Sequence, residues 1–262
     1  MDIFLVVAPV FGTNCTIVAP GSRAAVPDGV ARPCVIVDAG AGVVPGVTAL
    51  VREHGLSPTA VLATHGHADH TWDAAALCEV YGVPLWIHAA DAYRLADPLG
   101  TIEHGTSTGG TLTSGPLAAA LAAGGARLED YREPGEVRTF GSGGGSVADP
   151  HVRLDLGGVL LDALHAPGHT QGSTLYLPVA AGDEDGGGAG DGRAAGVVLA
   201  GDVLFAGSVG RTDLPGGDGE TMQRTLRDVV GRLDEALQVV PGHGPLTTVG
   251  RERRTNPYLR GL

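Results

Sequence analysis

The chain has 262 residues, of which 43% are hydrophobic, so it can bury a sizeable core, and its apolar runs fall short of the roughly 18–20 residues that span a bilayer. Its formal charge of −12 argues against nucleic acid as the main partner, because a phosphate backbone binds a basic face. Three scattered cysteines argue against a disulfide framework, and Asp2 stands where a signal peptide carries basic residues, so we expect a cytoplasmic protein without membrane association.

The first part of the chain alternates predicted strands and helices. Short apolar runs rich in β-branched residues predict strands over residues 3–9, 16–19, 34–37, 60–63 and 84–88. Helical spacing predicts helices over residues 44–54 and 73–81, and the start of another over 89–95. The strand at 60–63 runs directly into the sequence THGHADH at 64–70, so we expect this polar cluster to lie on a strand-to-helix loop.

The pattern of predicted strands and helices weakens over residues 97–150, where Gly, Ser and Thr are frequent. We interpret this stretch as an insertion or lid, with a short helix at 117–123 and a flexible GSGGGS sequence at 141–146. Regular β patterns then predict strands over residues 152–156, 159–164, 173–179, 197–200 and 238–240. An exposed loop is expected over residues 181–195 and an amphipathic helix over 220–236. The tail after residue 245 is too short to be a domain, so residues 1–262 are predicted to form one domain.

Both halves therefore repeat one theme, a β-meander followed by strand–loop–helix units. Two meanders packed face to face with helices outside would give an α/β protein with a four-layer αββα sandwich. In such a fold the polar residues at the strand ends gather along one edge, where binding sites commonly form.

The strongest chemical signal is the sequence His65-x-His67-x-Asp69-His70 on the loop after residues 60–63. Alternate residues of an extended segment point the same way, so His65 and His67 can reach one ion, while Asp69 and His70 turn toward a second. Imidazole and carboxylate are ligands that divalent zinc, iron and manganese accept. The pattern therefore predicts two divalent metal ions, with zinc favoured.

Three further candidate ligands follow apolar strands and stand beside glycine, which permits close backbone approach. They are His169 in APGHT, Asp202 in AGDVLF and His243 in VPGHG. Each is weak alone, because a single His or Asp at a strand end is more often structural. His165 fits a packed structural histidine better than a partner of the ligands, and His54, His88, His104 and His151 lack any companion pattern.

The ordered set of His65, His67, Asp69, His70, His169, Asp202 and His243 resembles the metallo-β-lactamase superfamily over nearly the whole chain. Four motifs of this chain resemble those of the glyoxalase II-like branch. They are residues 64–70, 166–170 (APGHT), 201–213 (GDVLFAGSVGRTD) and 241–245 (PGHGP). The resemblance implies a first metal site of His65, His67 and His169, and a second of Asp69, His70 and His243. Asp202 would bridge the two ions.

The resemblance also implies a metal-bridging hydroxide as the nucleophile, with Asp69 orienting it as a catalytic residue. Asp38 and Arg211 match positions that support the site in the superfamily. The expected activity is hydrolysis of a thioester, as in hydroxyacyl-thiol hydrolases, or of a related ester or lactone. The substrate would be a small molecule, and the protein a monomer or homodimer.

Other functions on the same fold remain open. A persulfide dioxygenase, which in that family uses one iron held by two His and one Asp, is compatible with the sequence GRTD at 210–213. A β-lactamase or a nuclease fits less well, because the chain is acidic and no export signal is recognised. A metal-binding protein without catalysis fits an open two-ion site poorly.

Overall fold

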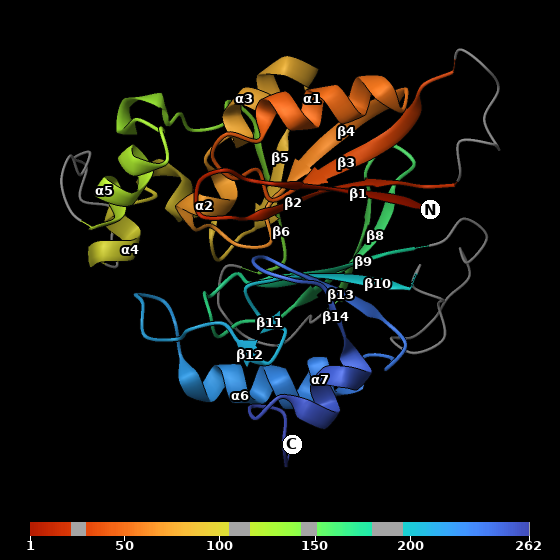
Figure 1. The fold of residues 1–262 in the computed structure, drawn as a ribbon, viewed down its shortest axis with the longest axis vertical. Coiled ribbons are helices and arrows are strands. Elements are labelled where there is room, and N and C mark those ends of the chain that lie inside the picture. Colours follow the sequence, from red (N-terminus) through yellow and green to blue (C-terminus); the bar gives the residue numbers. More distant parts are fainter. Residues whose placement is uncertain (22–29, 105–115, 143–150, 180–195, 262) are drawn as a thin grey trace.

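The computed structural model describes residues 1–21, 30–104, 116–142, 151–179 and 196–261. Two six-stranded sheets lie face to face at the centre of the molecule (Figure 1). Helices α1 (Val44–Glu53) and α3 (Ala74–Tyr81) cover the outer face of one sheet, and α6 (Gly219–Asp228) and α7 (Val249–Thr255) cover the outer face of the other. This arrangement confirms the predicted four-layer αββα sandwich.

The first sheet has the strand order β1-β2-β3-β4-β5-β6. Its strands are β1 (Asp2–Val7), β2 (Asn14–Ala19), β3 (Arg32–Val37), β4 (Leu56–Leu62), β5 (Leu85–His88) and β6 (Val137–Phe140). The first three strands pair antiparallel, and β3 to β6 pair parallel. Successive side chains of β3 point to opposite faces, so Cys34 and Ile36 pack toward the helices while Val35 and Val37 pack toward the second sheet.

The second sheet has the order β14-β13-β10-β9-β8-β7. Its strands are β7 (His151–Asp155), β8 (Leu160–His165), β9 (Thr174–Pro178), β10 (Val197–Gly201), β13 (Gln238–Pro241) and β14 (Thr247–Thr248). Only β10 and β13 pair in parallel among these strands, and the short hairpin β11 (Leu204–Phe205) to β12 (Ser208–Val209) stands apart. Parallel β10 and β13 end side by side, which brings two of the candidate ligands to one edge.

The helix ends follow local chemistry. The Asp73 carboxylate accepts the backbone N–H groups of Gly42 and Val43 at 2.8 and 3.0 Å, where α1 begins. Asp218 caps α6 by accepting the Thr221 N–H at 2.7 Å. The remaining short helices are α2 (Ala68–Thr71), η2 (Ala92–Ala96), α4 (Gly100–His104), α5 (Pro116–Ala123), η3 (Leu128–Asp130) and η4 (Val230–Arg232). Within the described ranges, no helix is both long and apolar enough to cross a membrane.

The helix predicted over residues 220–236 is wrong beyond Asp228. The structure has α6, then the separate 3₁₀ helix η4. The Arg253 guanidinium donates to the backbone carbonyls of Gly231 and Leu233, so these carbonyls serve a tertiary contact instead of continuing the helix. Likewise the segment predicted to begin a helix at residue 89 forms a 3₁₀ helix, and the tail after residue 245 carries β14 and α7.

The stretch at residues 97–150 contains the predicted short helix at 117–123, found as α5, and also a strand that its composition does not indicate. Its strand β6 extends the first sheet, with Leu85 opposite Val137. Only Phe140 of this edge strand is buried, so the sequence lacks the apolar run that marks a central strand. The predicted loop at 181–195 and most of the GSGGGS sequence lie outside the described residues, and a lid role for 97–150 stays a prediction.

Candidate metal centre

Four loops bring the predicted ligands to one edge of the sandwich. His65, His67, Asp69 and His70 follow β4, and His169 lies on the loop between β8 and β9. Asp202 follows β10, and His243 follows β13. Gly201 pairs with Pro241 across the parallel strands, so the last two loops leave their sheet together. The Thr174 N–H donates to the Thr64 carbonyl at 2.9 Å, which joins the first loop to β9 of the other sheet.

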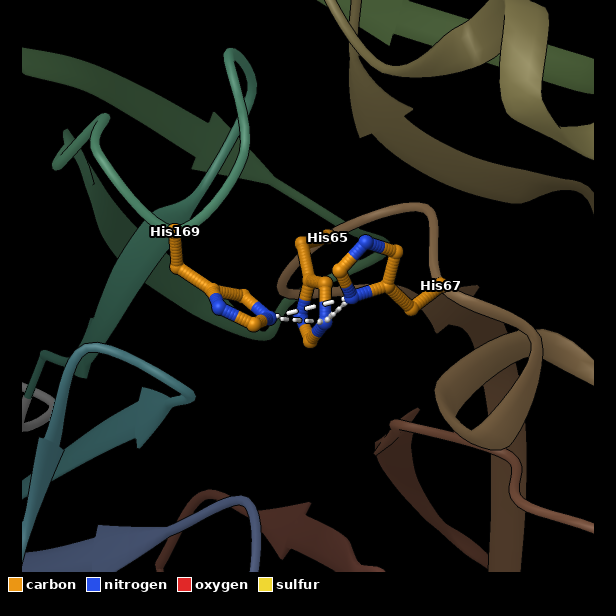
Figure 2. A group of neighbouring side chains, drawn as sticks. All are labelled: His65, His67 and His169. Atoms are coloured by element: carbon orange, nitrogen blue, oxygen red, sulfur yellow. Dashed lines mark hydrogen bonds between the residues drawn. The ribbon is translucent and has the colours of Figure 1, made fainter. Parts of the chain in front are cut away.

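Three imidazoles converge at the centre of this edge (Figure 2). His65 Nε2 lies 3.1 Å from His67 Nδ1, and His169 Nε2 lies 3.2 Å from the former atom and 3.0 Å from the latter. Nitrogen atoms bound about 2 Å from one tetrahedral ion lie about 3.3 Å apart, so these separations fit a shared cation. His67 Nε2 is buried and, in the part of the chain that the structure describes, has no hydrogen-bond partner. The unused nitrogen leaves Nδ1 as the atom of His67 that serves the group.

A second group lies beside the first. Asp69 Oδ2 is 3.1 Å from His243 Nε2 and 3.8 Å from His70 Nε2, and the two imidazole nitrogens are 3.3 Å apart. Both groups place ligand atoms within 4.8 Å of one another, as does a third combination of His65, His70 and Asp202. The seven predicted residues therefore form overlapping sets, each able to hold a divalent ion.

The Asp202 carboxylate lies between the two groups. Its Oδ1 is 3.3 Å from His70 Nε2 and 3.7 Å from His243 Nε2. Its Oδ2 is 3.6 Å from His169 Nε2. The two oxygens of one side chain thus face different groups.

The protonation of the histidines differs between the groups. Burial, with the neighbouring imidazoles, lowers the pKa of His65 well below its usual value and that of His67 to about 3, so both are neutral and offer a lone pair. Burial also acts to lower the pKa of His70, but the charges of Asp38, Asp69 and Asp202 outweigh it and raise the pKa well above its usual value. Burial acts to lower the pKa of His243, but the hydrogen bond with Asp69 together with the charges of Asp202 and Asp69 outweighs it and raises the pKa. The second group therefore holds protons before an ion binds.

In four of the five histidines the ring nitrogen that points away from the site lies close to an oxygen atom, in three of them as a hydrogen bond and at His70 as a charge contact. Such contacts help to orient the other ring nitrogen toward the site. The pairs are His65 Nδ1 with Thr64 Oγ1 at 3.2 Å, His70 Nδ1 with Asp38 Oδ2 at 3.0 Å, His169 Nδ1 with the Arg211 carbonyl at 2.8 Å, and His243 Nδ1 with the Phe11 carbonyl at 3.1 Å. Arg211 thus contacts the site through its backbone, while its guanidinium pairs with Asp213 at the surface.

The other histidines whose side chains the structure describes, His54, His88, His151 and His165, lie outside this arrangement. His165 stacks on His88, with ring centroids 4.1 Å apart, and lies 2.7 Å from the Gln171 carbonyl. His54 packs on Phe4, and His151 pairs with Asp162 at the surface. Two buried residues that the sequence did not single out, Asp91 and Arg94, lie under the ligand loops. No local motif marks them, because their partners are distant in sequence.

The geometry of two overlapping His and Asp groups at the edge of an αββα sandwich agrees with a family comparison. The family model described as the metallo-beta-lactamase superfamily matches residues 9–243, which is most of the chain and spans all seven candidate ligands. The chain therefore belongs to the metallo-beta-lactamase superfamily. This is a superfamily of metallo-hydrolases, whose members bind divalent metals.

Three curated relatives align with this chain over most of their lengths. An uncharacterised protein of Mycobacterium tuberculosis is 35% identical over 97% of this chain and 96% of its own. The probable metallo-hydrolase YqgX of Bacillus subtilis is 32% identical over 87% of this chain and 88% of its own. The hydroxyacylglutathione hydrolase GloC of Haemophilus influenzae is 28% identical over 99% of this chain and 98% of its own.

Solved structures agree on the fold. The BLEG-1 B3 metallo-beta-lactamase superimposes with a TM-score of 0.69 at 26% identity, covering 99% of this chain and all of the other. TTHA1623, solved in a di-iron-bound form, gives a TM-score of 0.67 at 29% identity and covers 98% of this chain and all of the other. ETHE1 from Myxococcus xanthus, at 20% identity and a TM-score of 0.63, covers all of this chain and 85% of its own, and shares the fold. One of these structures is named a metallo-beta-lactamase and another is described as di-iron-bound, and the shared fold does not select a metal or an activity for this chain.

Proposed function

We propose that this protein is a dinuclear metallo-hydrolase that cleaves the thioester of a small-molecule thiol. The position of Asp202 carries the proposal. Its Oδ1 faces His70 and His243 while its Oδ2 faces His169, so one carboxylate serves both groups. A site for a single ion needs neither this shared side chain nor a second complete ligand set.

In this proposal His65, His67 and His169 hold the first ion, and Asp69, His70 and His243 hold the second, with Asp202 shared. When bound, two divalent ions lower the pKa of water toward neutrality and polarise a carbonyl oxygen, which is the chemistry that thioester hydrolysis requires. Neutral imidazole with carboxylate suits zinc, and iron and manganese accept the same ligands.

Side-chain exposure indicates the side from which substrate enters. Asp69 is 25% exposed and His243 27%, whereas His70 is fully buried and His169 is 3% exposed. The substrate carbonyl therefore approaches next to Asp69. Burial acts to raise the pKa of Asp69, but the His70 charge and the hydrogen bond with His243 outweigh it and lower the pKa, so the carboxylate is ionised at neutral pH. We assign it the orientation of the attacking water.

Two observations support a thioester as the substrate class. The sequences at residues 64–70, 166–170, 201–213 and 241–245 resemble the glyoxalase II-like branch, and the Haemophilus influenzae relative that aligns over nearly the whole chain is named a hydroxyacylglutathione hydrolase. The proposal names the class of substrate and does not specify its acyl group or its thiol.

The experiment is a comparison of matched S-acyl thiols and oxygen esters that share one acyl group, with kcat/KM measured on zinc-loaded protein. We expect the thioesters to be cleaved far faster. A variant carrying Asp213→Asn, which removes only a surface carboxylate paired with Arg211, should behave as wild type. Equal and slow hydrolysis of both substrate types would rule out the thioesterase.

One observation favours a second candidate, a mononuclear-iron persulfide dioxygenase. His65, His70 and Asp202 offer two imidazoles and one carboxylate within 4.8 Å of one another, which is the kind of set that non-haem iron uses. Elemental analysis separates the two candidates. Close to two zinc ions per chain supports the hydrolase, whereas a single iron with oxygen uptake on persulfides supports the dioxygenase.

A further inference from the structure

A buried carboxylate outside the ligand set joins two of the ligand loops. Asp91 lies between β5 and η2, and its side chain is fully buried. Its Oδ2 accepts the Gly66 N–H at 2.9 Å and the Thr170 hydroxyl at 2.7 Å. Its Oδ1 accepts the Gly172 N–H at 2.8 Å. Gly66 stands between His65 and His67, and Thr170 follows His169. One side chain therefore connects the two loops that carry the three imidazoles of the first group.

The two glycines that contact Asp91 leave no space for a side chain. A Cβ atom at Gly66 would lie 2.9 Å from the Asp91 carbonyl oxygen and 2.8 Å from Arg94 Cδ. A Cβ atom at Gly172 would lie 2.7 Å from both Cβ and Cγ of Asp91. Both loops therefore approach the Asp91 region as closely as backbone can. The close approach explains why glycine stands at these two positions beside the ligands.

Arg94 extends the connection to a third loop. Its Nε lies 3.5 Å from Asp91 Oδ1, a charge contact between two fully buried side chains. Its Nη2 donates to Gln171 Oε1 at 2.8 Å and to the Pro215 carbonyl at 3.0 Å. A buried carboxylate is costly to ionise without a countercharge, and Arg94 supplies that charge. The pair thus ties the 65–67 and 169–172 segments to the loop before α6.

We propose that Asp91 is a positioning residue for the first ion, an inference that rests on the proposed metal site. Asp91 sets the spacing of the loops that carry His65, His67 and His169 and touches none of these ligands. Without the carboxylate, the buried N–H groups of Gly66 and Gly172 lose their acceptor, and the loops must rearrange to satisfy them. The ligand atoms of the second group make no hydrogen bond with Asp91 among the described contacts, so its ion should be unaffected.

The test measures metal affinity in the full chain instead of activity. The metal-free protein is titrated with Co²⁺ against a competing chelator, and the two binding steps are followed by visible absorption. His169→Ala and His243→Ala, which each remove one ligand, assign the steps to the first and second groups. We expect Asp91→Asn to weaken the first-group ion roughly 10- to 100-fold and to leave the other step unchanged. Thr170→Val, which removes only one of the three contacts, should weaken the same step by less.

Two matched variants give the test its specificity. Asp38→Asn removes the carboxylate beside His70 and also alters the contact with Thr64 next to His65, so it should weaken the second-group ion more than the first. Asp73→Asn removes a carboxylate that accepts three backbone N–H groups at the start of α1, so it should lower the stability of the metal-free protein without changing either affinity.

The outcomes separate the inference from the proposed function. If wild type binds two Co²⁺ ions and Asp91→Asn binds both with unchanged affinity, the positioning role is wrong and the metal site stands. If both affinities fall together with the unfolding free energy of the metal-free protein, Asp91 is only a structural residue. If wild type does not bind two ions, the dinuclear site and the inference fail together.

Discussion

His70 Nδ1 lies 3.0 Å from Asp38 Oδ2, on the opposite side of the ring from the Nε2 atom that faces Asp202. The same Asp38 carboxylate accepts the Thr64 N–H at 2.8 Å, just before His65. Asp38 achieves this with a φ of +63°, one of two non-glycine residues in the described chain with a positive φ. A strained backbone at this point places one carboxylate against both the loop and a candidate ligand.

The strain at Asp38 can be separated from the loss of its carboxylate. Asp38→Gly and Asp38→Ala remove the same carboxylate, but only alanine is disfavoured at positive φ. We expect Asp38→Ala to lower the unfolding free energy of the metal-free protein by about 1 kcal/mol more than Asp38→Gly. Urea unfolding followed by circular dichroism measures the difference. Equal stabilities of the two variants would show that the backbone is not strained there.

Asp202→Ala should sharply reduce both bound metal and the rate of hydrolysis, because the residue faces both groups. Elemental analysis of the purified variant gives the metal content, and thioester turnover gives the rate. Asp213→Ala, which removes an exposed carboxylate, is the control. Full metal content in Asp202→Ala would contradict the bridging assignment.

Metal uptake should release protons unequally from the two groups. In the metal-free protein the pKa of His70 lies well above its usual value and that of His243 is raised, which favours their protonated forms, whereas the lowered pKa values keep His65 and His67 neutral near pH 7. An ion entering the second group must displace protons, so its affinity should fall as the pH falls. Calorimetry in two buffers of different ionisation enthalpy counts the protons. His243→Ala should release fewer, and an unchanged count would contradict the expectation.

Glu252 holds the C-terminal helix to the β11–β12 hairpin. This buried carboxylate accepts the Gly207 N–H at 2.7 Å and the Thr247 hydroxyl at 2.6 Å. Glu252→Gln places an amide N–H₂ against one of these donors, and we expect a loss of about 1–3 kcal/mol in the unfolding free energy. Thermal unfolding tests this, with Glu235→Gln, in an exposed ion-pair network, expected to remain close to wild type. Wild-type stability of Glu252→Gln would show that the contact contributes nothing.

The sequence predicted the sandwich and the candidate ligand set because both depend on local signals. A buried run such as residues 60–63 followed by closely spaced His and Asp marks a strand end with ligands, whatever the rest of the chain does. The structure brings all seven predicted ligands together, and it shows that Arg211 reaches the site through its carbonyl, which no side-chain pattern can indicate.

The features that the sequence did not reveal depend on distant partners. β6 is an edge strand with one buried residue, so it has no apolar run. The carbonyls that follow α6, at Gly231 and Leu233, are contacted by Arg253, far along the chain. Asp91 gains its importance from Gly66 on one side and Thr170 on the other, and an isolated Asp after a strand carries no sign of either contact.

The candidate ligands divide between the two halves of the fold, with residues 65–70 following β4 of the first sheet and His169, Asp202 and His243 attached to strands of the second. A bound ion would therefore add a cross-link between two layers that are also held by apolar packing and by hydrogen bonds such as those of Asp91 with Thr170 and Gly172. Each group draws ligands from both halves, so neither group would be complete if the halves separated. Selection for metal binding would in this way also select for the docking of the two sheets.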